Sequence, residues 1–298
     1  MIDCAIVLGG PRKRELALRS PLLVAAGALG AAPSPRDHPF LAPDGPIGGV
    51  VTPPFTVTAI TETGPARLAR TTAGYVLHGG RRNPGLRRAI RRYSARWERM
   101  GLPVIAALYA RYPADVAELA AAVSECECLQ GIEIHFPSGV APDEAFESTR
   151  LALGESAVPC LARVPFGTAV EVARAVADAE VDALVVAAPP VGRAPAEAGR
   201  WVSGPFHSPA LTPLYVELVQ RVRAATPIPI IARGGIADTA HALALFGAGA
   251  IAVQLDSILM VRPAAPDEIY RDLEAELARL GAKDWDSFLR AIGTHPSD

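Results

Sequence analysis

Two titratable residues interrupt the apolar segment GIEIHF at residues 131–136. If this segment is a strand, alternation puts Glu133 and His135 on one face and the isoleucines on the other. A carboxylate beside an imidazole can serve as an acid–base pair, and Ser138 adds a hydroxyl group three residues later. The other interpretation is a buried Glu–His hydrogen bond with a purely structural role.

A pair of adjacent glycines, Gly234 and Gly235, follows the apolar run 228–232. Glycine lets the backbone turn tightly and approach a ligand closely. A second apolar run, 251–255, is followed by Asp256 and Ser257. In a barrel of alternating strands and helices, backbone amides after the last two strands form a phosphate site. The pattern predicts a phosphate-bearing cofactor, and its alternative is a tight turn that binds no ligand.

A single cation, Arg163, lies near the end of the apolar run 159–164. An arginine in such a place usually meets a phosphate, a carboxylate or an electron-rich ring. The alternative is a salt bridge to Glu133. We expect His78 and His207 on solvent-exposed loops. Because histidines and carboxylates are not spaced as metal ligands, the sequence predicts no metal site.

Eight short apolar runs alternate with helix-like segments. The runs are 21–26, 47–52, 103–108, 131–136, 159–164, 183–188, 228–232 and 251–255. Buried strands that alternate with helices indicate a parallel (β/α)8 TIM barrel. We expect a single domain over 1–298, with an N-terminal hairpin at 2–19 and a C-terminal helical extension over 264–298. Residues 55–85 and 189–204 lack clear periodicity, and we interpret them as a lid and a Pro/Gly-rich loop.

The composition is that of a globular protein of modest charge. Half of the 298 residues are hydrophobic and the net charge is −2, so neither nucleic acid nor an anionic membrane is an expected partner. No apolar run reaches the roughly 18 residues that span a bilayer, and the start lacks a signal-peptide pattern. Four irregularly spaced cysteines are expected to be reduced thiols, which favours a cytoplasmic location. The alanine-, arginine- and proline-rich composition suggests a bacterial source.

These motifs, in this order, resemble the dihydroorotate dehydrogenase family of FMN-dependent (β/α)8 flavoproteins. The resemblance covers about residues 14–263 and rests on SPLLVAAGALG, GGVVTPPFT, TTAGYVLHGGRRNPG, PVIAALYARYPADVAELA, GIEIHFPSG, PCLARVPFG, SPALTPL, IPIIARGGI and GAIAVQLDS. It implies FMN at the barrel mouth, a small-molecule substrate and a homodimer.

The resemblance also implies roles for individual residues. The FMN phosphate would contact Gly234, Gly235, Asp256 and Ser257, and the ring would lie near Ala26, Gly27, Thr52 and Arg163. An ungapped register puts Ser138 on the family's catalytic base, whereas a register that matches the following proline puts Phe136 there. We assign proton transfer to Ser138, His135 and Glu133, and substrate contacts to His78, Asn83 and Ser203.

The sequence departs from the family's pattern at several site positions. Pro53 and Arg163 stand where the family has lysines. Asp256 replaces a glycine of the phosphate site, where its charge would repel phosphate unless it points away. The family's asparagines are replaced by Leu77, Ala107, His135, Val140 and Ala188. Each polar ligand group left unpaired costs on the order of 1–3 kcal/mol, so we expect a substrate other than dihydroorotate.

The sequence therefore predicts an FMN-dependent oxidoreductase that acts on a CH–CH bond of a small molecule. The alternative is a barrel that has lost FMN and serves as a non-redox enzyme, a ligand-binding protein or an inert partner subunit. The sequence lacks a cysteine cluster for an iron–sulfur centre, so electrons are expected to pass to a soluble acceptor or a partner.

Overall fold

Eight parallel strands form a closed barrel in the order β10-β13-β14-β3-β4-β7-β8-β9. The computed structural model describes residues 4, 6–10, 13–61, 67–80, 83–109, 111–196 and 199–293. The barrel strands are β3 (Leu22–Val24), β4 (Ile47–Val51), β7 (Val104–Tyr109), β8 (Gly131–His135), β9 (Cys160–Arg163), β10 (Ala183–Val186), β13 (Ile230–Arg233) and β14 (Ala252–Leu255). Nearly every residue in them is buried, which explains why they read as continuous apolar runs. The predicted (β/α)8 barrel is confirmed.

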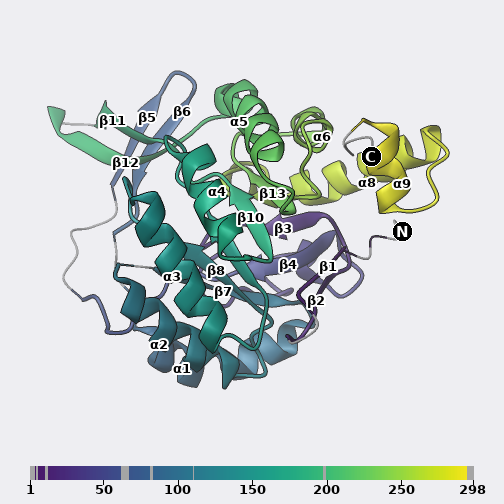
Figure 1. Cartoon of the computed structure of the whole chain (residues 1–298). Coiled ribbons are helices and arrows are strands. Elements are labelled where there is room, and N and C mark those ends of the chain that lie inside the picture. The colour runs from purple at the N-terminus through teal and green to yellow at the C-terminus, as the bar shows by residue number, and fades with distance from the viewer. Residues whose placement is uncertain are drawn as a thin grey trace.

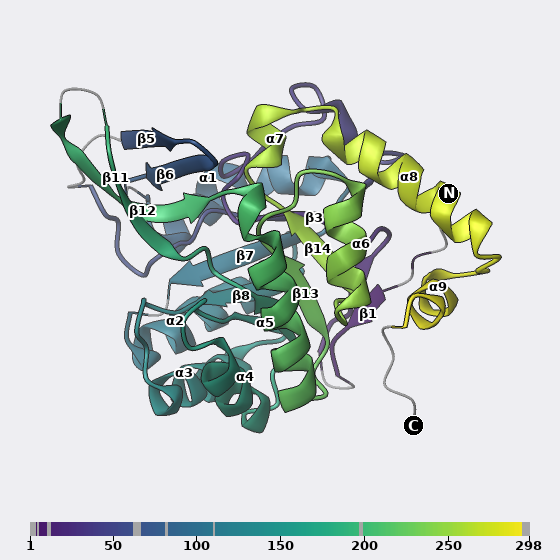
Figure 2. The same cartoon turned by 90° about the horizontal axis from the view of Figure 1, so that it is seen from above.

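Helices surround the barrel, as the two views in Figures 1 and 2 show. They are α1 (Leu86–Met100), α2 (Pro113–Ser124), α3 (Pro142–Glu155), α4 (Ala169–Asp178), α5 (Thr212–Ala225), α6 (Thr239–Gly247), α7 (Ile258–Val261), α8 (Ala265–Arg279) and α9 (Trp285–Ala291), with short 3-10 turns η1 (Pro39–Leu41) and η3 (Pro209–Leu211). Prolines stand in the first turns of α2, α3, α5 and α8, where a missing amide hydrogen costs nothing. Asp238 caps α6 by accepting from the amide of His241.

The predicted N-terminal hairpin is present as β1 (Ile6–Leu8) and β2 (Leu16–Leu18), which pair antiparallel. The Leu16 side chain packs against Gly131, the first residue of β8. Gly9, in the hairpin turn, lies against Pro159 just before β9. The hairpin therefore closes the end of the barrel where the strands begin, which leaves their carboxyl ends free to build a site.

The C-terminal helices pack on the outside of the barrel. The Trp285 indole donates a hydrogen bond to the carbonyl of Ile251 at 2.8 Å. Its ring also meets Phe246 of α6 edge-on, with centroids 4.9 Å apart. The predicted C-terminal helical extension is confirmed in its placement over α6 and β14.

A second sheet stands over the barrel mouth (Figure 2). It has the order β11-β12-β6-β5, with β5 (Arg67–Thr71), β6 (Gly74–His78), β11 (Val191–Pro195) and β12 (Trp201–His207). The prediction of an irregular lid and a Pro/Gly-rich loop was wrong for these residues. The strands pair antiparallel, and β6 meets β12 from more than a hundred residues away. Pairing between such distant segments leaves little local signal.

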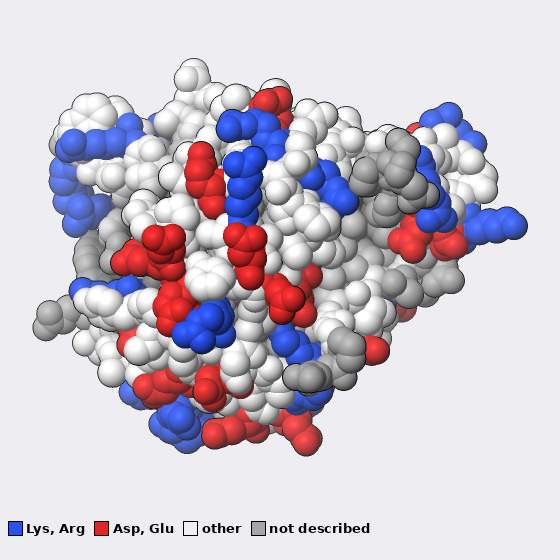
Figure 3. Space-filling view, viewed as in Figure 1, with Lys and Arg blue, Asp and Glu red and all other residues white. Residues whose placement is uncertain are grey.

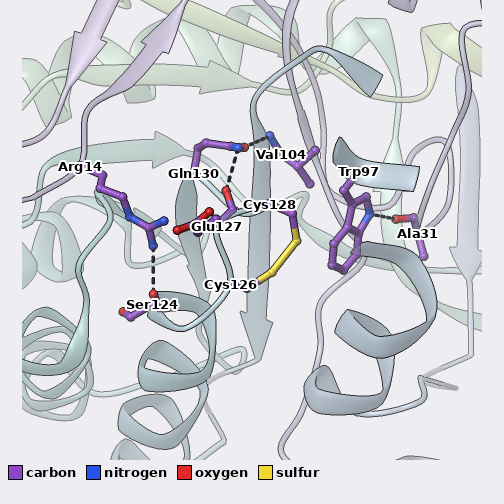
Figure 4. The surroundings of a disulfide bond; sticks show 9 residues. All are labelled: Arg14, Ala31, Trp97, Val104, Ser124, Cys126, Glu127, Cys128 and Gln130. Atoms are coloured by element: carbon purple, nitrogen blue, oxygen red, sulfur yellow. Dashed lines mark hydrogen bonds between the residues drawn. A yellow bond between two sulfur atoms is a disulfide. The ribbon is translucent and has the colours of Figure 1, made fainter. Parts of the chain in front are cut away.

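A disulfide links Cys126 and Cys128 in the turn between α2 and β8 (Figure 4). This corrects the expectation that all four cysteines are reduced thiols. Cys160, in β9, is a free thiol and is buried. The turn lies near Gln130, whose side chain accepts from the amide of Val104. Only one residue separates Cys126 from Cys128, and this spacing does not distinguish a disulfide from a pair of reduced thiols.

The described surface carries mixed charge. Figure 3 shows acidic and basic side chains interspersed over the face formed by the outer helices. Among the described residues, no helix is long and apolar enough to cross a membrane.

Candidate functional site

Seven polar side chains from five strands converge at the carboxyl ends of the barrel strands. This mouth cluster consists of Glu133 and His135 (β8), Arg163 (β9), His207 (β12), Arg233 (β13), and Gln254 and Asp256 (end of β14). In a (β/α)8 barrel this is the end that binds ligands. The cluster holds two carboxylates and two guanidinium groups, so its formal charge is zero when both imidazoles are neutral.

Glu133 is the buried centre of the cluster. His135 Nε2 donates to one carboxylate oxygen at 2.5 Å, and Gln254 Nε2 donates to the other at 2.6 Å. Burial alone would raise the pKa of Glu133. The hydrogen bond from His135 and the charges of Arg163 and Arg233 outweigh that effect and lower it. Glu133 is therefore an ionised carboxylate with both oxygens engaged.

His135 is held as a neutral imidazole. Burial, and then the charge of Arg163, lower its pKa, although Glu133 opposes the shift. Because Nε2 donates to Glu133, Nδ1 is the acceptor nitrogen, and it is buried without a hydrogen-bond partner. The predicted pairing of Glu133 with His135 is present, and the observed hydrogen bond is compatible with both the structural and the acid–base interpretation. The carboxylate fixes the ring, and Nδ1 can still take a proton.

Arg163 is a half-buried cation whose buried Nε is an unused donor. Its Nε has no partner, and among the described residues no ion pair joins it to Glu133. Burial and the neighbouring charge of Arg233 lower its pKa to about 9, so it remains charged at neutral pH. Buried charged donors are normally satisfied, so an unused one indicates room for an acceptor supplied by a ligand.

Asp256 does not point away from the predicted phosphate site. It lines a pocket together with Ser208, Gly234, Gly235 and Ser257. Its Oδ2 accepts from Arg233 Nη2 at 2.7 Å and lies 3.5 Å from His207 Nδ1. The expected repulsion of phosphate is therefore offset by Arg233. The expectation that His207 is solvent-exposed was wrong, because its side chain is only 11% exposed and its ring stacks on Tyr75.

The turn after β13 has the geometry that the double glycine predicted. Gly234 and Gly235 have φ values of 111° and 72°. A Cβ atom at Gly234 would overlap the Tyr215 ring, and one at Gly235 would overlap Thr212. Only glycine suits both positions. Among the described residues, the amides of Gly235 and Ser257 donate to no protein acceptor.

These donors match the groups of FMN. Two free amides and a serine hydroxyl suit a phosphate, as at other phosphate-binding turns. Three buried guanidinium nitrogens lack partners: Nε of Arg163, and Nε and Nη1 of Arg233. That of Arg163 suits an acceptor such as the carbonyl edge of a flavin ring, and those of Arg233, which bonds Asp256 in the pocket, suit a phosphate. The chemistry of the donor set therefore fits the cofactor, with the Asp256 carboxylate as the one opposing group.

The remaining predicted cofactor residues lie at adjacent strand ends. Ala26 and Gly27 follow β3 and are half-buried, and the Gly27 amide donates to Val51 at 3.3 Å. Thr52 is buried after β4, and its hydroxyl accepts from the amide of Ala107 at 3.0 Å. Thr52 therefore shapes the mouth through the backbone, since its hydroxyl is already used.

The structure does not bring the other predicted residues into the mouth cluster. Ser138 is exposed in the loop after β8, and no contact to Glu133 or His135 is present among the described residues. His78 and Ser203 are exposed on β6 and β12. Asn83 accepts from Thr56 and from the amide of Gly85, both at 2.9 Å, and so holds a loop together.

Sequence reasoning missed Arg233 and Gln254. Both lie in apolar strands, IIARGG and AVQLDS, where each single polar residue was a signal of the same kind as Arg163. Tyr215 was also missed as part of the site, because the helix that delivers it comes from a distant segment.

Comparison with known proteins agrees with this geometry. The nitronate monooxygenase family model matches residues 146–276. The catalytic subunit of dihydroorotate dehydrogenase B (NAD(+)) from Geobacillus kaustophilus is 28% identical over 89% of this chain and 90% of its own length. The subunit of the same name from Geobacter sp. (strain M21) is 27% identical over 97% of this chain and 98% of its own.

The two matches agree on the type of cofactor as well as on the fold, because members of both families are FMN-dependent flavoproteins. The resemblance inferred from the motifs is thereby confirmed: the chain is a divergent relative of the dihydroorotate dehydrogenase catalytic subunits.

Proposed function

We propose that this protein is an FMN-dependent oxidoreductase that acts on a CH–CH bond of a small molecule other than dihydroorotate. The observation that carries the proposal is the set of unused donors at the barrel mouth. Arg163 and Arg233 keep buried nitrogens without partners, and Arg233 bonds Asp256, which lines one pocket with Gly235 and Ser257, whose amides are free. Such donors are costly to bury unless a ligand completes them.

The residues would divide the work between binding and proton transfer. Gly235 and Ser257 would hold the phosphate, and Ala26, Gly27 and Arg163 would hold the ring. FMN, when bound, supplies an acceptor for hydride. His135 would take the proton at Nδ1, because Glu133 fixes its ring and keeps the other nitrogen protonated. Ser138 would reach a substrate only from the exposed loop.

Apolar side chains support a substrate unlike dihydroorotate. Ala107 and Val140 are buried where the family pattern has asparagines, and neither can hydrogen-bond a ligand through its side chain. Each polar group of a substrate that is left there without a partner would cost on the order of 1–3 kcal/mol. The proposed substrate is therefore a more apolar or a simple anionic molecule.

The first experiment is a visible spectrum of the purified protein with mass analysis of what co-purifies. We expect a flavin band roughly stoichiometric with the chain, and no turnover of dihydroorotate. An Arg163→Met variant should bind both FMN and riboflavin at least tenfold more weakly, which is about 1.4 kcal/mol. The exposed Arg174→Met variant on α4 is the matched control and should bind as the parent does.

A second candidate is a barrel of the same fold that does not use FMN. It is favoured by one observation: the Asp256 carboxylate lines the pocket that would take the phosphate. A colourless preparation that also fails to take up added FMN would select this candidate. A cytoplasmic location and a homodimer stay predictions.

A further inference from the structure

Two residues from separate elements, Arg233 and His207, share a single carboxylate oxygen of Asp256 in the phosphate pocket. Asp256 Oδ2 receives Arg233 Nη2 at 2.7 Å and lies 3.5 Å from His207 Nδ1. The side chains of Arg233, Asp256 and His207 are 5%, 14% and 11% exposed. Arg233 makes this one hydrogen bond and keeps two buried nitrogens unused. The pair is therefore placed to change partners without exposing either charge to water.

We propose that Asp256 is a built-in counter-ion that an incoming phosphate displaces from Arg233, and that His207 takes up a proton to become the new partner of Asp256. This inference rests on the proposed function, since it concerns the same cofactor pocket. In its terms, Arg233 exchanges one anion for another, and the imidazole supplies a positive charge that offsets part of the negative charge that the phosphate brings.

Charge counting supports the exchange. The described mouth cluster holds two arginines and two carboxylates, so a fully ionised phosphate monoester would add about two uncompensated negative charges. Unpaired buried charge is strongly unfavourable, so a compensating cation must appear. His207 is the neighbouring group that can become one near neutral pH. It faces Asp256, Arg233 of β13 and the Tyr75 ring of β6.

The direction of the linkage follows from the pKa of His207 in the protein without a ligand. Burial lowers the pKa of His207 there, with Asp256 acting in the opposite sense. The imidazole is thus neutral before binding. A proton taken up on binding makes the affinity fall as pH rises, by at most tenfold per pH unit for one proton. A phosphate monoester ionises fully only above its second pKa near 6, so measurements between pH 7 and 8.5 isolate the protein group.

The test measures FMN and riboflavin binding by flavin fluorescence in the full-length apoprotein between pH 7 and 8.5. Riboflavin lacks the phosphate and serves as the matched ligand. For FMN we expect the dissociation constant of the parent protein to rise several-fold per pH unit, and for riboflavin we expect little change. Asp256→Asn should bind FMN about tenfold more tightly at pH 8 and lose the pH dependence, since one charge–charge interaction of about 1.4 kcal/mol is removed.

His207→Phe provides a second variant that keeps the ring stacked on Tyr75. It should remove the pH dependence and weaken FMN binding while Asp256 remains in place. Asp178→Asn, an exposed carboxylate at the end of α4, is the control and should behave as the parent.

Each outcome separates this inference from the proposed function. If the parent, Asp256→Asn and His207→Phe all bind FMN with the same affinity and the same pH dependence, the counter-ion exchange is wrong and the FMN enzyme stands. If only Asp256→Asn binds FMN, the carboxylate does oppose the phosphate, and the parent protein is not an FMN enzyme. If none binds FMN or riboflavin at any pH, both ideas fail.

Discussion

Glu133→Gln should destabilise the protein more than any exposed charge change. The substitution keeps the shape of the side chain, and its one acceptor oxygen can still pair with His135. Its NH2 group can pair with Gln254 only if the Gln254 amide turns over. The substitution removes the negative charge that faces two arginines, Arg163 and Arg233. Removing one partner from a buried ionic arrangement typically costs about 3–5 kcal/mol. Because the hydrogen bond from His135 can survive, we expect the lower end, about 3 kcal/mol of the free energy of unfolding.

Urea unfolding at pH 7.5, followed by far-ultraviolet circular dichroism, measures this change. The control is Glu217→Gln, an exposed position in α5, where the change should stay within about 0.5 kcal/mol. Equal stabilities of the two variants would refute the assignment of Glu133 as the buried counter-ion. If Glu133→Gln lowers the free energy of unfolding in the parent but not in an Arg163→Met background, Arg163 is the cation whose charge Glu133 balances.

Three further changes test other parts of the site. The pKa of His135 is lowered in the folded state, so the unfolded chain binds more protons below about pH 6.5. The free energy of unfolding should therefore fall as pH drops below that value, by up to about 1.4 kcal/mol per pH unit. In acid-unfolding curves, His135→Gln should reduce this slope. Gly234→Ala should cost about 2 kcal/mol, because its φ of 111° and the Tyr215 ring both oppose a side chain, whereas Gly247→Ala in α6 has open space and should be neutral in thermal melts. Asn83→Ala should lower stability by about 1–2 kcal/mol through its lost loop hydrogen bonds; an unchanged melting curve together with weaker substrate binding would restore the predicted substrate role.

The barrel was predictable because its signal is local. Each buried strand is a short apolar run, and each glycine turn or proline start marks an element boundary within a few residues. The four-stranded sheet was not predictable in the same way. Gly74 and Gly204 lie within its strands, and its register joins Tyr75 to His207 across the chain. Turn-like residues and non-local pairing both hide a strand from local patterns.

In the candidate site, too, a feature within one strand was predictable, whereas a contact between two strands was not. The Glu133–His135 pair follows from alternation within one strand, and it is present. The Arg233–Asp256 ion pair depends on the adjacency of β13 and β14 in the barrel, and no pattern within either strand alone indicates it. A polar residue at the end of each of two neighbouring parallel strands was the available signal.

The second sheet ties together two walls that face each other across the barrel. β5 and β6 belong to the connection after β4, and β11 and β12 belong to the connection after β10, four places away in a ring of eight. The two halves of this sheet are joined where β6 pairs with β12, through the residue pairs Val76–Phe206 and Tyr75–His207. A ligand that enters or leaves the barrel mouth must pass beneath the four-stranded sheet or separate β6 from β12. The β6–β12 pairing includes His207, whose ring faces Asp256.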